Sequence, residues 1–280
     1  LGNQTNQTDL LLLVSKDLSD EDMKRVVEIA ESPKKRIVKT EEDGSTKNEV
    51  LEPVNKLNFA LKKVDLENFS SAFNESFNEA NENGYKWFSI IDNGDFLEED
   101  WVKYFELYSS ELEDISIFLP LTRQISAGNM TGHLNEATWL EGKAEVAGQA
   151  DLQILMSWNC LSPTGCMFKV EDIKEYSEER GGKSYPFKEN MSIASSYEFF
   201  LRMIYEDLKT YTIPRYGYQM RLDKNDSSFS KLSSKIPSNL TQLEKSKGGM
   251  TQHEIGFWME QAKSEYFMSE DREIEYEEKV

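Results

Sequence analysis

The chain has 280 residues, of which 51 are acidic and 32 basic, and its formal net charge is -19. Hydrophobic residues make up 38% of it, so we expect a folded α/β protein with a sizeable core. A surface this negative repels phosphate backbones and anionic lipid surfaces. It argues against nucleic acid as a partner but leaves room for a local nucleotide pocket.

The chain shows no membrane or disulfide signature. The apolar run from Leu10 to Val14 is too short to span a bilayer, and no basic segment precedes it as in a signal peptide. Cys160 and Cys166 are too few for a disulfide framework and are expected to be small core residues. These features predict a cytoplasmic chain with reduced thiols.

The first elements follow a strand–helix–strand order. Leu10 to Val14 predicts a buried strand, and Ser19 ahead of the acidic residues 20–22 predicts the start of a helix that Pro33 ends. Residues 36–39 predict a second strand. This order is typical of a parallel α/β sheet.

The rest of the chain divides into a folded part and a C-terminal extension. We expect a domain over residues 1–222, a polar linker or wrap over 223–250, and a helix with an acidic tail over 251–280. Within the domain, the patterns predict a loop over 44–56, strands over 57–61, 86–91 and 115–119, and helices over 69–81 and within 191–205. His133 is expected in a surface loop, and Trp139 is a candidate for lining an acceptor groove.

Four segments, in order, resemble family 2 glycosyltransferases. They are Glu41-Glu42-Asp43-Gly44-Ser45-Thr46, the helix from Asn74 to Gly84, the strand that ends at Asp92-Asn93-Gly94-Asp95, and the stretch from Cys160 to Arg202 that contains Ser162-Pro163-Thr164-Gly165. A short strand from Ile213 to Arg221 follows, so the resemblance covers roughly residues 10–222. It implies a GT-A fold: a mixed, mostly parallel sheet flanked by helices.

The resemblance also implies where a nucleotide-sugar donor would bind. Glu42, Asp43 and Asp92 would contact the nucleotide, while Asp95 and Asp92 would hold Mn²⁺ or Mg²⁺ against the leaving diphosphate. Gly94 falls where the family has its metal-binding acid. A cofactor-free protein is the alternative, and Asp-Asn-Gly-Asp is equally typical of a plain turn.

The general base of the resembled enzymes also has no direct counterpart. Ser196 occupies that position, with Ser195 beside it, and a neutral hydroxyl does not accept the proton at ordinary pH. Glu198 or Asp100 would have to substitute, although Glu198 lies about 200° around the helix from Ser196.

Two functions therefore remain open. One is a catalytically degenerate binding or structural module, with a protein partner at the C-terminal segment and a possible oligomer or assembly. The other is an active inverting, metal-dependent transferase that moves a sugar from a nucleotide sugar to a hydroxyl. The Lys-, Asn- and acid-rich composition resembles that of family 2-like proteins of large tailed phages, some of them virion components, so for a viral chain the virion is the alternative to the cytoplasm.

Overall fold

The computed structural model describes residues 10–15, 18–31, 34–40, 47–53, 59–64, 69–92, 94–140, 144–157, 160–189 and 195–222. The chain divides into two compact units, Leu1–Leu66 and Glu67–Val280, which we describe separately. The predicted linker and C-terminal helix after residue 222 lie outside the described residues.

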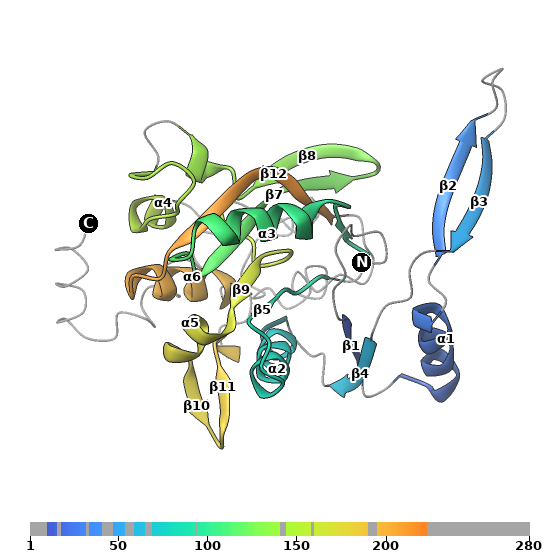
Figure 1. The fold of residues 1–280 in the computed structure, drawn as a ribbon, viewed down its shortest axis with the longest axis horizontal. Coiled ribbons are helices and arrows are strands. Elements are labelled where there is room, and N and C mark those ends of the chain that lie inside the picture. Colours follow the sequence, from blue (N-terminus) through green and yellow to red (C-terminus); the bar gives the residue numbers. More distant parts are fainter. Residues whose placement is uncertain are drawn as a thin grey trace, which may run out of the picture. The chain divides into compact units, whose positions relative to one another are not determined.

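The first unit contains two small pairs of strands and one helix (Figure 1). Strand β1 (Leu10–Ser15) pairs in parallel with β4 (Phe59–Val64), and β2 (Lys34–Thr40) pairs antiparallel with β3 (Lys47–Pro53). The parallel pairing of β1 with a later strand agrees with the expected α/β opening.

Helix α1 (Asp20–Glu31) begins where the sequence predicts. The backbone N–H of Asp22 donates to Ser19 Oγ at 3.1 Å, and Met23 N–H donates to the Ser19 carbonyl at 2.9 Å. Ser19 is therefore the N-cap, and the acids of the first turn lie at the positive end of the helix dipole.

The loop predicted over residues 44–56 is wrong, because most of it is β3. The polar composition concealed a strand whose pairing with β2 uses main-chain groups, in register from Thr40↔Lys47 to Lys34↔Pro53. Strand β2 consequently belongs to a hairpin rather than to a parallel sheet.

The second unit is built on a six-stranded mixed sheet. Its order is β5 (Trp87–Phe88), β9 (Met167–Lys169), β7 (Ile117–Ser126), β12 (Thr210–Arg221) and β6 (Phe96–Leu97), with β8 (Asn129–Leu134) paired to β7. The central pair β7–β12 is parallel, and the other pairings are antiparallel.

Helices cover both faces of this sheet. Because side chains alternate along a strand, Ile117 and Leu119 join one core cluster while Phe118 joins another. The first cluster contains side chains of α2 (Phe69–Glu82), α4 (Leu152–Ser157), α5 (Val170–Glu175) and α6 (Ser195–Tyr205). The second cluster is covered by α3 (Trp101–Glu111). The result is an α/β protein with a mixed sheet flanked by helices, as the sequence predicts.

Several boundaries differ from the predictions. The strand expected over 86–91 is regular only at Trp87–Phe88, and the strand expected over 115–119 is the longer β7. Helix α3 and the hairpin β10 (Glu178–Arg180) with β11 (Lys183–Tyr185) were not predicted. His133 lies in β8 rather than in a loop, because Ala127 and Gly128 form a tight turn just before that strand.

Two other predictions can be compared directly with the structure. Cys160 and Cys166 are buried in the first core cluster, so their assignment to the core is confirmed. Among the helices that the structure describes, none combines the length and apolarity needed to traverse a bilayer.

Candidate functional site

A tight turn follows the segment that resembles a metal-site strand. The N–H of Asp95 donates to the Asp92 carbonyl at 3.1 Å, which closes the turn. Gly94 has a φ of 79°, a conformation that glycine adopts without a Cβ clash. The position where the resemblance expects an acid is therefore one whose backbone favours glycine.

Tyr218 links the strand-end acids. It lies on β12, is 0% exposed, and its hydroxyl donates to Asp95 Oδ2 at 2.8 Å. The same hydroxyl oxygen accepts the Asp92 N–H at 3.1 Å. The structure thus brings Asp92 and Asp95 together, with a tyrosine hydroxyl between them.

The second carboxylate oxygen of Asp95 is also used. Asp95 Oδ1 accepts the backbone N–H of Arg221 at 2.7 Å, at the end of β12. Both carboxylate oxygens of Asp95 are therefore hydrogen-bonded to β12. A cation at this carboxylate would have to share its oxygens with these two bonds.

Burial keeps the Tyr218 hydroxyl protonated. Removal from water raises the pKa of Tyr218 well above its ordinary value, and the nearby charge of Asp95 raises this pKa further. The neutral hydroxyl can therefore donate to Asp95 across the whole physiological pH range.

The segment Ser162-Pro163-Thr164-Gly165, part of the family resemblance, packs on the Tyr218 ring. Gly165 has a φ of 78°, and its N–H donates to the Ile90 carbonyl at 2.9 Å. A Cβ at Gly165 would lie 2.5 Å from Tyr218 Cδ2. Asn135 holds the same segment, since its Oδ1 accepts the Ser162 N–H at 2.8 Å. The segment is thus fixed on the tyrosine by close packing.

A further acid, Glu98, also binds β12, and sequence reasoning missed it. Gln219 Nε2 donates to Glu98 Oε1 at 2.7 Å, and Arg123 Nη1 lies 3.4 Å from the same oxygen. The N–H of Glu98 donates to the Gly217 carbonyl at 2.9 Å. We call Asp95 and Glu98, with their partners Tyr218, Gln219 and Arg221, the β12 clasp.

Glu198 lies in a different cluster, inside α6. It is 0% exposed, Arg202 Nε donates to its Oε1 at 2.8 Å, and Lys188 Nζ lies 3.3 Å from the same oxygen. Arg202 also donates to the carbonyls of Tyr176 and Pro186. The carboxylate is thus the centre of a buried ion network that joins α6 to two loops.

The remaining predicted site residues are dispersed. Ser195 is buried and Ser196 half-buried at the start of α6, whereas Asp100 is exposed just before α3. Glu42 and Asp43 lie outside the described residues, so the predicted nucleotide contacts at these acids stay predictions. Trp139 has its indole N–H bound to the Thr212 carbonyl at 2.8 Å.

Metal-ligating side chains do not gather in the part of the chain that the structure describes. No group of three or more His, Cys, Asp or Glu residues there is arranged to hold a metal ion. Because Gly94 offers no side-chain ligand and no group of three acids gathers around Asp95, the described residues do not fit the Mn²⁺ or Mg²⁺ site that the resemblance implies.

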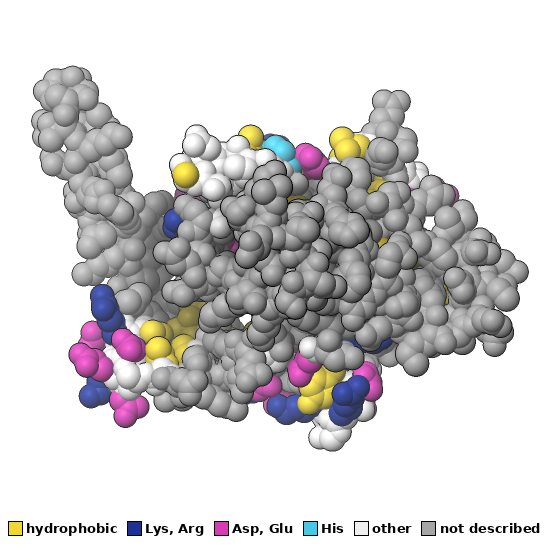
Figure 2. Space-filling model, turned by 180° about the vertical axis from the view of Figure 1, so that it is seen from behind, with side chains coloured by type: hydrophobic (Ala, Val, Ile, Leu, Met, Phe, Trp, Pro, Cys, Tyr) yellow, Lys and Arg dark blue, Asp and Glu magenta, His cyan; other side chains and the backbone are white. Residues whose placement is uncertain are grey.

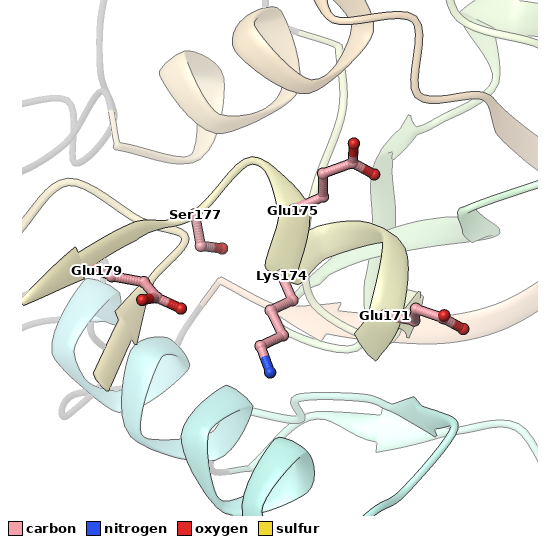
Figure 3. A pocket seen from close by; sticks show the side chains of 5 residues that line it. All are labelled: Glu171, Lys174, Glu175, Ser177 and Glu179. Atoms are coloured by element: carbon pink, nitrogen blue, oxygen red, sulfur yellow. The ribbon is translucent and has the colours of Figure 1, made fainter. Parts of the chain in front are cut away.

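A shallow hollow of about 410 Å³ lies beside α5 (Figure 3). Its lining residues are Glu171, Lys174, Glu175, Ser177 and Glu179. A nucleotide diphosphate would meet mainly carboxylates there, so the hollow is a poor donor pocket. On the face that Figure 2 shows, the described Asp and Glu side chains lie beside Lys and Arg side chains.

Comparison with known proteins gives likeness in structure but no match in sequence. No protein-family model matches the chain, and no curated protein matches it. The crystal structure of S. aureus TarS, a GT-A-type glycosyltransferase, superimposes with a TM-score of 0.51 at 13% sequence identity. The match covers 88% of this chain but only 38% of the TarS chain.

This likeness concerns the fold. At such low identity, the similarity to TarS shows a GT-A-like, glycosyltransferase-like fold and leaves activity to be argued from the site. The protein is thus glycosyltransferase-like in architecture, and its strand-end acids bind a neighbouring strand.

Proposed function

We propose that this protein is a catalytically degenerate, family 2-like glycosyltransferase homologue that serves as a binding or structural module. The observation that carries the proposal is that the Asp95 carboxylate accepts bonds from both Tyr218 and Arg221, with only Gly94 at the position of the metal-binding acid. An acid that ties two strands together stabilises the fold, and a metal ion would compete with that role.

The state of the other catalytic positions supports the proposal. Gly94 has no side chain to offer a cation, and Ser196 has no carboxylate to accept a proton. Glu198 is fully buried and bound by Arg202, so it has no access to an acceptor hydroxyl without breaking its ion network. Loss of a general base alone lowers a rate by about a hundred- to ten-thousand-fold.

The proposal extends to partners and location. A module of this kind would act through a protein partner or an assembly, in the cytoplasm or, for a viral chain, in the virion. The phage-like composition supports the second location. The chain spans only 38% of the length of TarS, so the proposal takes nothing from the activity of TarS.

The alternative is an active, inverting transferase that uses a nucleotide sugar with Mn²⁺ or Mg²⁺. The adjacency of Asp92 and Asp95 at one turn favours it. In that case the Asp95 carboxylate would hold the cation while it also accepts the Tyr218 hydroxyl.

Turnover separates the two functions. The full chain is incubated with a panel of UDP- and GDP-sugars and Mn²⁺ or Mg²⁺, and released nucleotide is measured. We expect no release above the protein-free background. Metal-dependent release that is lost in Asp95→Asn and retained in Asp114→Asn, a surface carboxylate paired with Lys209, would establish the transferase instead.

A further inference from the structure

An aromatic strip crosses the second unit at the N-terminal end of β12. The ring of Tyr211 lies 5.9 Å from that of Trp139 in a T-shaped contact and 5.8 Å from that of Tyr108. The three rings come from β12, from the 3₁₀ turn η1 (Ala137–Trp139) and from α3. They therefore form one continuous surface feature made by three separate elements.

The strip is partly open to solvent. Trp139 is 38% exposed, and Val146, in the turn that packs on these rings, is 52% exposed. Tyr108 and Tyr211 are half-buried beside them. Aromatic and aliphatic side chains that are partly exposed next to one another are a feature of docking surfaces.

The rings are held rigidly. The Trp139 indole N–H donates to the Thr212 carbonyl, so the polar edge of that ring is already satisfied. Gly148, with a φ of 86°, lets the turn approach closely, because a Cβ there would lie 2.8 Å from both Trp139 and Tyr211. A preorganised surface loses little side-chain entropy when it is covered.

The chain itself carries a complementary segment. Residues 251–268, which lie outside the described residues, place Ile255, Trp258, Met259, Ala262 and Tyr266 at the spacing of one helix face. A helix with such a stripe docks its apolar face on a hydrophobic surface.

The tether has the length that this docking needs. From Leu222, the last described residue, back to Tyr211 along β12 is roughly 35 Å at about 3.3 Å per residue. Residues 223–250, as the polar linker their composition predicts, have a root-mean-square span of roughly 30 Å. The local concentration of a tethered segment is highest when these lengths match.

We propose that residues 251–268 dock as an amphipathic helix on the strip formed by Trp139, Tyr211, Tyr108 and Val146 of the same chain. Tethering favours this intramolecular occupant over a second copy, and two chains of net charge -19 repel each other. The docking makes the C-terminal segment a part of the folded protein.

Hydrogen–deuterium exchange on the full chain tests the proposal. In the wild type, we expect slow exchange across 251–268, independent of protein concentration. Val146→Glu should raise that exchange rate about tenfold, because it places a charge in the apolar contact. Met130→Glu, at a residue that is 56% exposed on β8, should leave the rate unchanged.

A second variant covers the case in which Val146→Glu fails to fold. Trp258→Ser alters only the C-terminal segment, and it should raise the exchange rate of the rest of that segment about tenfold as well. Exchange of 251–268 at the rate of an unfolded chain in the wild type would overturn the proposal. Protection that is indifferent to both variants, or that grows with protein concentration, would overturn it as well, the last in favour of a second copy.

Discussion

The hydroxyl of Tyr218 lies 2.8 Å from Oδ2 of Asp95, although 122 residues separate the two in the sequence. This bond, together with the one from the Arg221 N–H, ties the turn after Asp92 to the C-terminal end of β12. The carboxylate that the family resemblance assigns to a cation therefore ties two strands together.

The clasp predicts a stability cost for Tyr218→Phe. Loss of a hydrogen bond to a carboxylate should lower the free energy of unfolding by about 1.5–3 kcal/mol. Urea denaturation measures this change. Tyr216→Phe is the matched control, because its hydroxyl contacts His133 at the exposed surface, and the cost there should be within about 0.5 kcal/mol. Equal costs at the two tyrosines would contradict the clasp.

The raised pKa of Tyr218 predicts a loss of stability at alkaline pH. Burial, and then the charge of Asp95, raise this pKa above the value of about 10 that the unfolded chain has. The folded state therefore keeps the proton where the unfolded state releases it. The contribution of the Tyr218 proton to the free energy of unfolding is complete below about pH 10. Above that pH it falls by about 1.4 kcal/mol per pH unit.

Unfolding midpoints in urea at a series of pH values from about 9 to 11 measure this slope. Tyr218→Phe lacks the group, so the pH dependence of its stability should be shallower by that amount. Parallel curves for the two proteins would show that Tyr218 titrates normally in the folded state.

Close packing at Gly165 predicts a large effect of a single methyl group. Gly165→Ala meets both a φ of 78° and the Tyr218 ring, whereas Gly181→Ala meets a φ of 59° with open space around it. We expect a cost of about 1–2 kcal/mol at Gly181 from backbone strain, and a further 1–3 kcal/mol or so at Gly165 from overpacking. The difference between the unfolding temperatures of the two variants isolates the cost of the contact with the Tyr218 ring. Equal decreases in unfolding temperature would show that this ring moves aside at little cost.

The ion pairs of Glu198 predict that the negative charge of this side chain is essential to the fold. Glu198→Gln leaves Arg202 without its buried counter-charge and should cost about 3–5 kcal/mol. Asp114→Asn, which breaks an exposed pair with Lys209, should cost less than about 1 kcal/mol. If Glu198→Gln left the free energy of unfolding nearly unchanged, the fold would not need this carboxylate, and Glu198 could serve another role.

The sequence predicted the elements that carry a strong local signal. Ser19 and the acids after it marked the start of α1, and the phenylalanines at helical spacing marked α2. Apolar runs located β1 and β7, although not the full length of β7. Each of these signals depends on neighbouring residues alone.

The missed features depend on distant partners. Strand β3 has a polar sequence and forms by pairing with β2, while β12 has register shifts around Pro214 to Gly217 that no local pattern encodes. Helix α3 begins at Trp101 without a side-chain cap bond from Asp100, so the usual start signal is weak.

The candidate site was only half predictable for the same reason. The sequence identified Asp92, Gly94 and Asp95 as a unit, and the structure shows them in one turn. It could not show that Tyr218 would lie between the acids, because that contact depends on the pairing of β12 with β6. Nothing in the sequence around Tyr218 and Arg221 indicates that both would bind the Asp95 carboxylate.

Titration of the full chain with Mn²⁺ in the presence of UDP, followed by calorimetry, tests the central claim most directly. If the Asp95 carboxylate belongs to the β12 clasp, no saturable heat should appear up to about 1 mM ligand. Saturable binding in the wild type that disappears in Asp95→Asn, while Asp114→Asn still binds, would contradict this account.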